Sequence, residues 1–438
     1  MIVDDGGPVT AAKVAEAAAL VGTPLYLYDE ATILGRCAEL LAMPNAFGLQ
    51  VGYAMKANSS RAILELIAGA GLGVDASSLN EVRRAVLAGI PPSRIMLTTQ
   101  EVPTGADRAE LERLMTEGLR YDACSLLQLE RVAGFAADRG LAIAVRVNPG
   151  AGAGESVTRN TGDKYSSFGI HPRDHARAAA LARARGVRVD TVHVHIGSGG
   201  DPESWRANID RMLEITERHF PDATTLDLGG GFKEARMPDE RPADVHALGL
   251  HARQRFEAFA ARTGRRLVMV VEPGTFVVAN AGYLVTTVID RKSSGPDGFD
   301  FVVCDGGMES STRPLLYGSR HPLYVVSRAG RLRSSEFAAT PPEPLAPRVV
   351  VGPCCESGDS QTLDERGYVA PRPMADAAVG DWLVVGGAGA YVAAMSLAGY
   401  NSHPRAPEVL LRRDGSLRII RQRQTLAELV ADERPLSE

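Results

Sequence analysis

The chain has 438 residues, of which 45% are hydrophobic and 23% are charged, and its formal net charge is -5. This composition is typical of a globular protein with one large and one smaller domain, and the acidic balance argues against nucleic acid or an anionic membrane as a partner. The N-terminal segment lacks a basic stretch followed by an apolar core, and no apolar run approaches the roughly 20 residues of a bilayer span. We therefore expect a cytoplasmic protein that binds neither nucleic acid nor membranes.

The five cysteines are odd in number and show no Cys-x-x-Cys spacing. Neither a disulfide framework nor a structural zinc site is predicted from this pattern, so we expect reduced thiols. The cysteines are Cys37, Cys124, Cys304, Cys354 and Cys355.

The first two-thirds of the chain alternate between apolar strands and amphipathic helices. After a helix near 10–21 and a strand at 24–29, the predicted strands are 51–56, 71–75, 94–99, 119–123, 142–148, 189–196, 224–230 and 266–273. Helical segments such as 59–71, 77–89 and 125–140 open with a serine that can cap the helix and close with glycine. Eight strand-and-helix units over roughly 250 residues predict an α/β fold, a (β/α)8 barrel of the TIM type.

Beyond about residue 275 the pattern changes to strands without intervening helices. The runs lie at 282–292, 299–307, 347–353, 381–387 and 408–424. Proline-rich and turn-forming segments separate them, which predicts a second, antiparallel β domain. We expect the barrel over residues 30–275, with residues 1–29 and 276–438 forming the β domain that completes the active site.

Polar residues recur at the carboxyl ends of the predicted barrel strands, the face that carries the chemistry in such barrels. Each has a plainer explanation: a strand-end lysine can be a solvated charge, an aspartate can cap a helix, and glycines can simply turn the chain. Their joint appearance at one rim favours function. The residues are Lys56, Asp75, Asn148, His195, Gly229 to Gly231 and Glu272.

His193 and His195 are two residues apart and so face the same side of their strand. Such a pair suits a metal ion. No carboxylate or cysteine lies beside them at ligand spacing, so no metal site is predicted.

One cofactor suits this rim particularly well. Lys56 can condense with an aldehyde, Glu272 can accept a hydrogen bond from a protonated pyridine nitrogen, and the flat ring of His195 can stack on a planar ligand. The glycines at 229–231 offer backbone N–H groups to a phosphate after the seventh strand, where barrels commonly bind one. Together these features predict pyridoxal 5'-phosphate.

The chain resembles the fold-type III, alanine-racemase-like family of pyridoxal-phosphate-dependent decarboxylases, and most closely its diaminopimelate decarboxylase branch. The matching stretches run in the family's order and cover nearly the whole chain. They are YAMKAN, HVHIGSG, LDLGGGF, EPG, STRPLLYG, CCESGD, GAGAYVAAM and YNSHPRAPEVLL.

The resemblance implies a role for each site residue. Lys56 carries the cofactor, His195 stacks on its ring and Glu272 binds its nitrogen. The phosphate side is served by Ser198, Gly229, Gly230, Gly231 and Tyr391. Cys355 enters from the other subunit of a head-to-tail homodimer as the proton donor, and the distal end of the substrate is held by Arg313, Tyr317 and Glu356.

Two positions depart from the family's pattern: Thr275 and His403 stand where the family usually has arginine. Arg159 and Lys164 lie in a long loop and can supply the missing positive charge. The expected activity is decarboxylation of meso-2,6-diaminopimelate to L-lysine.

Several other functions stay open. One is decarboxylation of ornithine, lysine, arginine, a D-amino acid, or a siderophore or antibiotic intermediate. An amino-acid racemase is disfavoured by Glu272, because the resemblance implies arginine at that position in racemases. A non-catalytic cofactor-binding protein is disfavoured by CCESGD and by the C-terminal β domain.

Overall fold

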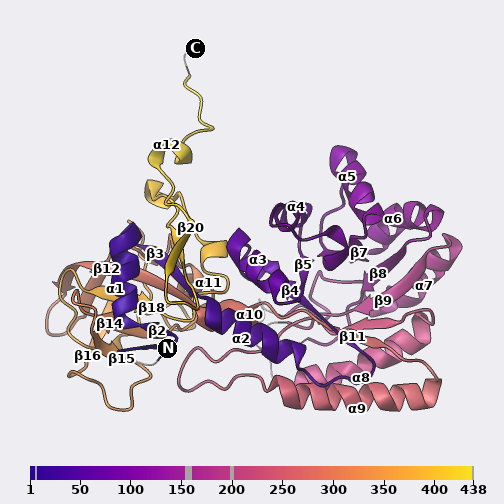
Figure 1. Ribbon diagram of the computed structural model, residues 1–438, viewed down its shortest axis with the longest axis horizontal. Coiled ribbons are helices and arrows are strands. Elements are labelled where there is room, and N and C mark those ends of the chain that lie inside the picture. Colours follow the sequence, from indigo (N-terminus) through magenta and orange to yellow (C-terminus); the bar gives the residue numbers. More distant parts are fainter. Residues whose placement is uncertain (5–6, 153–159, 198–201, 437–438) are drawn as a thin grey trace. The chain divides into compact units, whose positions relative to one another are not determined.

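The computed structural model describes residues 1–4, 7–152, 160–197 and 202–436. The chain divides into two compact units, whose elements are labelled in Figure 1. The first, here called the β unit, comprises Met1–Ile33, Ala235–Glu240 and Val278–Glu438. The second, here called the barrel unit, comprises Leu34–Glu234 and Arg241–Val277.

The barrel unit contains a closed barrel of parallel strands, which confirms the predicted (β/α)8 architecture. The barrel closes where β11 pairs with β4, with Met269 opposite Leu49. The strands are buried along most of their length, as expected for parallel strands covered by helices. They are β4 (Leu49–Ala54), β5 (Gly73–Ala76), β6 (Ile95–Thr98), β7 (Arg120–Ala123), β8 (Ala142–Arg146), β9 (Arg188–His193), β10 (Thr225–Asp227) and β11 (Val268–Val271).

Helices follow the barrel strands, and serines begin several of them as predicted. Ser78 and Ser125 accept hydrogen bonds from backbone N–H groups three residues on, whereas Ser60 occupies the N-cap position without a side-chain bond. The helices are α2 (Glu30–Leu41), α3 (Arg61–Gly69), α4 (Leu79–Leu87), α5 (Gly105–Thr116), α6 (Leu126–Asp138), α7 (His175–Ala184), α8 (Pro202–His219), α9 (Val245–Thr263) and α10 (Thr275–Val278), with short 3-10 turns η1 (Met55–Ala57), η2 (Pro92–Arg94) and η4 (Pro172–Asp174).

The long helices α8 and α9 lie side by side along the barrel (Figure 1). Arg262 Nη1 of α9 lies 2.7 Å from Glu217 Oε1 of α8, and Arg255 pairs with Asp210 about two turns earlier in both helices. Within the described ranges, neither these helices nor any other is long and apolar enough to cross a membrane.

The β unit is built on a ten-stranded sheet. Most of its strand pairs are antiparallel, as predicted, but the sheet is mixed, because β3 pairs with β19 and β13 pairs with β16 in parallel. Parallel neighbours need a long connection, and the whole barrel unit separates β3 from β19 in the chain. The strands are β3 (Leu25–Asp29), β12 (Gly282–Ser293), β13 (Asp300–Cys304), β14 (Leu323–Val326), β15 (Leu332–Ser335), β16 (Ala346–Val351), β17 (Arg372–Met374), β18 (Trp382–Val385), β19 (Glu408–Leu411) and β20 (Leu417–Arg421).

An N-terminal helix packs on this sheet. Its residues Val14 and Ala17 are buried in one apolar cluster with Leu25 of β3 and Val384 of β18. The remaining elements of the unit are α1 (Ala11–Val21), the strand pair β1 (Ile2–Val3) and β2 (Val9–Thr10), α11 (Arg313–Tyr317), α12 (Leu426–Leu429) and the turns η5 (Ala279–Ala281), η6 (Ala393–Met395) and η7 (Tyr400–Ser402).

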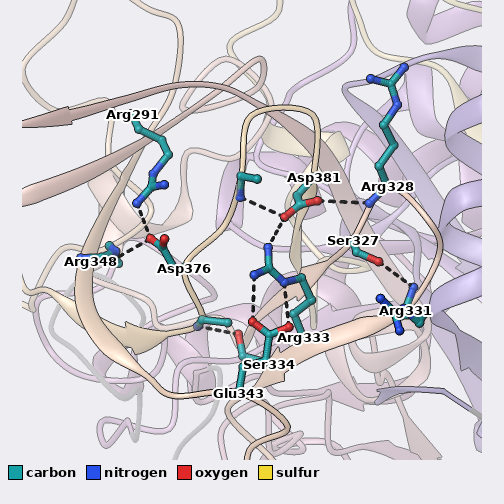
Figure 2. A network of polar contacts seen from close by, with 12 residues as sticks. Arg291, Ser327, Arg328, Arg331, Arg333, Ser334, Glu343, Arg348, Asp376 and Asp381 are labelled. Carbon is teal, nitrogen blue, oxygen red and sulfur yellow. Dashed lines mark hydrogen bonds and ion pairs between the residues drawn. The ribbon is translucent and has the colours of Figure 1, made fainter.

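Charged side chains fasten the loop between β17 and β18 to the sheet (Figure 2). Arg333 of β15 donates to Asp381 at 2.5 Å and forms a two-bond contact with Glu343 at 2.8 and 2.9 Å. Arg291 of β12 and Arg348 of β16 both reach Asp376. The loop is therefore held by several strands at once.

Candidate active site

The predicted rim residues of the barrel unit lie at the carboxyl ends of their strands. Lys56 lies in η1 directly after β4 and has an exposed side chain. Asp75 lies near the end of β5, His195 two residues beyond β9, and Glu272 immediately after β11. The glycines 229–231 begin two residues beyond the end of β10. Parallel strands bring these side chains to one end of the barrel.

At the centre of this rim, His193 bridges two carboxylates. Its Nδ1 lies 2.6 Å from Asp122 Oδ2 at the end of β7, and its Nε2 lies 3.2 Å from Glu272 Oε2. His193 and Asp122 are no more than 1% exposed, and Glu272 is 6% exposed. Asp227 adds a further buried carboxyl group, with polar atoms of His193, Asp227 and Glu272 all within 4.8 Å of one another.

The neighbouring charges decide the ionisation of these groups. Burial opposes the charge of Glu272, but His193 and Lys56 outweigh it and lower its pKa to about 2. Burial also opposes the charge on His193, but Glu272, Asp227 and Asp122 raise its pKa well above 6.5. At neutral pH this part of the rim therefore contains an ionised Glu272 beside an imidazolium.

Two other carboxyl groups on the rim have raised pKa values, in contrast to Glu272. Burial and the nearby charge of Glu272 raise the pKa of Asp227 well above its usual range. The same two causes raise the pKa of Asp75 to about 8. Both groups therefore hold their protons more tightly than Glu272, which carries most of the negative charge among these three acids.

The three glycines allow the loop after β10 to approach its neighbours closely. A Cβ on Gly229 would lie 2.4 Å from the carbonyl oxygen of Val194, and one on Gly230 would lie 2.3 Å from that of Glu272. Gly229 and Gly231 also have φ values of 64° and 95°, in the left-handed region that favours glycine. No other residue fits here without moving the backbone.

Two of these glycine N–H groups are used within the barrel unit. Gly229 donates to Asp227 Oδ1 at 2.9 Å, and Gly230 donates to His195 Nδ1 at 3.2 Å. These two donors thus have acceptors within the barrel unit in this structure. The bond from Gly230 also makes Nδ1 of His195 an acceptor.

His195 is accordingly a neutral ring with a defined tautomer. Burial and the positive charge of Lys56 hold its pKa well below 6.5. With Nδ1 accepting from Gly230, the proton sits on Nε2. The backbone is anchored as well, since Thr161 Oγ1 donates to the His195 carbonyl at 2.8 Å.

The rim fits a ligand with a protonated pyridine ring. Glu272 Oε1 is buried and has no hydrogen-bond partner among the residues that the structure describes. A buried carboxylate oxygen left without a donor is destabilising, so this atom suits a hydrogen bond from a ligand. An ionised Glu272, a neutral planar His195 and an exposed amine on Lys56 are the groups that pyridoxal phosphate requires.

In the β unit, the predicted substrate residue Arg313 lies at the start of α11 and is buried. Its Nε donates to His321 Nε2 at 3.3 Å and its Nη2 to Ser319 Oγ at 3.3 Å. His321 Nδ1 in turn donates to the Gly386 carbonyl at 2.9 Å, and burial and nearby arginines hold the pKa of His321 well below 6.5. Neutral groups thus orient the guanidinium, whose carbon lies 5.7 Å from the Tyr317 ring centroid.

The predicted residues Cys355 and Glu356 are both exposed and lie beside η7. The backbone N–H of Cys355 donates to Asn401 Oδ1 at 2.8 Å, and Tyr400 Oη donates to Glu356 Oε2 at 3.5 Å. The structure therefore brings the CCESGD and YNSHPR segments together. The neighbouring Cys354 is half-buried, and burial and Glu309 raise the pKa of its thiol to about 12.

The remaining predicted residues are less informative. Ser198 and Arg159 lie outside the described residues. Tyr391 is half-buried in the β unit with a φ of 59°. Lys164 lies 4.8 Å from the Tyr165 ring.

Sequence reasoning missed the partners of His193. Asp122 and Asp227 each end or nearly end a barrel strand, as Asp75 does. The same rule that selected Asp75 would have placed both at the rim, so the signal was present in the strand ends.

Comparison with known proteins identifies the family. Residues 36–279 match the sequence family described as pyridoxal-dependent decarboxylase, pyridoxal binding domain. The chain belongs to the pyridoxal-dependent decarboxylases. It is an enzyme that uses pyridoxal 5'-phosphate to decarboxylate an amino acid.

Individual relatives of this pyridoxal-dependent decarboxylase match over nearly the full length. The diaminopimelate decarboxylase of Streptomyces coelicolor is 36% identical over 98% of this chain and 93% of its own. A crystal structure of a diaminopimelate decarboxylase superposes with a TM-score of 0.87 at 32% identity, covering 97% of this chain and 96% of that one. The Helicobacter pylori enzyme complexed with L-lysine has a TM-score of 0.80 at 27% identity, covering 95% and 98%.

Proposed function

We propose that this decarboxylase converts meso-2,6-diaminopimelate to L-lysine and carbon dioxide. The observation that carries the proposal is Arg313, a buried guanidinium oriented by the neutral His321 and Ser319. Those two bonds fix the orientation of the guanidinium, whose planar fork of donors matches the two oxygens of a carboxylate. Glu356 is exposed and offers an acceptor for a distal ammonium group.

A substrate with an amino acid group at each end satisfies both residues. Lysine or ornithine has a distal ammonium for Glu356 but no distal carboxylate for Arg313. The relatives named diaminopimelate decarboxylase, matched over more than nine-tenths of this chain, support the same choice.

Within the barrel unit, we assign the cofactor to the rim groups. Lys56 holds it covalently, His195 stacks on its ring and Glu272 accepts the hydrogen bond of the pyridine nitrogen. Gly231 and the neighbouring glycines serve the phosphate, and the resemblance adds Ser198 and, from the β unit, Tyr391. This assignment rests on the resemblance and on the unpartnered buried oxygen of Glu272.

The residues then have separate tasks in the reaction. Bound pyridoxal phosphate supplies an electron sink for the bonding electrons that the departing carbon dioxide leaves behind. Glu272, ionised beside His193, keeps the positive charge of the ring nitrogen stabilised. Cys355 returns a proton to the substrate carbon, a task that suits an exposed thiol better than the half-buried Cys354.

We also propose a homodimer in which Cys355 of one subunit serves the cofactor of the other. Lys56→Ala and Cys355→Ala chains are each expected to be inactive, and mixing them is expected to restore part of the activity. A mixed dimer has one site with both residues intact. Inactivity despite demonstrated subunit exchange would place both residues of a site in one chain.

The proposed location is the cytoplasm. All five cysteines are free, as expected where thiols stay reduced.

The deciding assay measures carbon dioxide and amine release by the holoenzyme from meso-diaminopimelate, L-lysine, L-ornithine and their D-forms. We expect turnover of diaminopimelate, with Arg313→Ala raising its KM at least about tenfold through loss of a charge-assisted hydrogen bond. Arg320→Ala is the matched control, because Arg320 lies on the same segment but is exposed and pairs with Asp239 at 2.7 Å.

The runner-up is another carboxylate-bearing amino acid, such as a siderophore intermediate. Thr275 favours it, because this residue supplies no charge where the family usually has arginine. Failure to turn over diaminopimelate, with a monocarboxylic diamino acid used well and unaffected by Arg313→Ala, would contradict the proposal.

A further inference from the structure

The buried charges behind Glu272 include two residues that the proposed reaction does not use. His193 and Asp122 are both essentially inaccessible, and neither is among the groups assigned to the cofactor or substrate. They are joined by a 2.6 Å contact between Nδ1 and Oδ2, across 71 positions of the chain. Burying an ionisable pair is unfavourable unless the geometry is good and the charges are used, so the pair calls for an explanation.

The surroundings of the ring favour the imidazolium over a neutral histidine. Both nitrogens of His193 face carboxylate oxygens, at 2.6 Å from Asp122 and at 3.2 Å from Glu272. The contact with Asp122 is a hydrogen bond, whereas Nε2 and Glu272 approach closely without the geometry of a hydrogen bond. Burial opposes the charge of the ring, but the carboxylates raise its pKa well above 6.5.

The same contact divides the two oxygens of Glu272. Oε2 faces His193, while Oε1 is buried and has no partner among the described residues. The carboxylate is therefore paired with His193 through Oε2, and the Asp227 carboxyl group also lies beside it.

We propose that His193, held by Asp122, is a positioning residue that keeps Glu272 ionised and oriented, with Oε1 available to the pyridine nitrogen of the cofactor. The inference deepens the proposed role of Glu272 and rests on it. Asp122 orients the His193 ring and favours its positive charge. The charged ring orients Glu272 and keeps it ionised, and the ionised Glu272 favours the protonated form of the cofactor nitrogen. Partners behind a ligand commonly tune its affinity in this way.

Other ionisable groups surround the ring, and they fix the direction of the pH effect. The carboxylates favour the imidazolium, and the resulting positive charge favours the ionised Glu272. Removing the negative charge of Asp122 lowers the pKa of His193, so the imidazolium is lost at a lower pH. The groups are Asp75 on β5, Asp122 on β7, His195 beyond β9, Asp227 on β10 and Glu272 after β11, with Lys56 acting on Glu272.

The test uses His193→Gln and Asp122→Asn holoenzymes, with His175→Gln as the matched control. His175 is also buried, but it lies on α7 and its Nε2 contacts the Ile170 carbonyl at 2.9 Å, apart from this network. Cofactor is removed and titrated back while its absorption spectrum is recorded between pH 6 and pH 10. Neither measurement needs a substrate, so the result stands whether or not diaminopimelate is the substrate.

We expect both rim variants to bind pyridoxal phosphate at least about tenfold more weakly, by analogy with the loss of a residue that orients a metal ligand. In Asp122→Asn, the alkaline change in the cofactor spectrum should occur at least about one pH unit lower than in the wild type. The His175→Gln spectrum and affinity should match the wild type.

A folded His193→Gln enzyme with unchanged cofactor affinity and an unchanged spectral titration would overturn the proposal. If His193→Gln does not fold, Asp122→Asn decides alone, because it is nearly isosteric with the wild type. A wild-type spectral titration in folded Asp122→Asn would then show that the pair only stabilises the barrel.

Discussion

The barrel rim and the β unit hold their functional charges in different ways. On the rim, Glu272, His193 and Asp122 are buried, and each lies against another ionisable group. In the β unit, Arg313 is buried but donates to the neutral groups of His321 and Ser319. The rim thus holds its charges against one another inside the fold, whereas two neutral acceptors orient the guanidinium of Arg313.

The two residues that depart from the family's pattern, Thr275 and His403, lie outside the buried network of the rim. The resemblance places the missing arginine of position 275 near the cofactor phosphate and the distal carboxylate of the substrate.

The largest expected effect comes from removing the amine at the rim. Lys56→Ala should abolish turnover, because no other group can hold the cofactor covalently at that position. The side chain is exposed, so circular dichroism and the melting temperature of the apoprotein should be unchanged. Substantial residual turnover would mean that Lys56 and the rim do not carry the chemistry.

The next effect tests the charge of Glu272. Glu272→Gln saturated with cofactor should decarboxylate at least about tenfold more slowly, since an electrostatic partner of the ring nitrogen is lost. Single-turnover kinetics separate this chemical step from binding and release. An unchanged rate would assign the nitrogen to a different partner.

A pair of glycine substitutions measures how tightly the rim is packed. Gly230→Ala should lower the free energy of unfolding by about 1 to 3 kcal/mol, since its Cβ would lie 2.3 Å from the Glu272 carbonyl oxygen. Gly134→Ala, on α6 with no atom within 4 Å of the added Cβ, should raise it by up to about 1 kcal/mol. Urea unfolding of the apoproteins measures both. Equal effects would show that the loop after β10 yields easily.

A further expected effect is a pH-dependent gain in stability. The pKa of Asp75 is about 8 in the folded protein against an ordinary 3.8, so its carboxyl group disfavours the folded state increasingly as pH rises between those values. Asp75→Asn imitates the protonated form. The melting temperature of the apoprotein should match the wild type near pH 4 and exceed it increasingly towards pH 8. A gain that is constant with pH would mean that Asp75 is ionised in the fold.

The sequence supported the barrel and the location of the rim, because strand ends can be read from periodicity. It could not show that His193 meets Asp122, since their contact depends on which strands become neighbours across 71 residues. The parallel pairing of β3 with β19 was hidden for a similar reason, because the alternation of apolar residues is the same in parallel and antiparallel strands. Long-range pairing, rather than local structure, was the missing information.

The position of the covalent attachment shows directly whether Lys56 at the barrel rim holds the cofactor. Holoenzyme is reduced with borohydride, digested, and its peptides are sequenced by mass spectrometry. The account predicts cofactor on Lys56, in the peptide containing AMKAN, beside the buried network of Glu272 and His193. Cofactor fixed instead on one of the other lysines would contradict this assignment. The other lysines are Lys13, Lys164, Lys233 and Lys292.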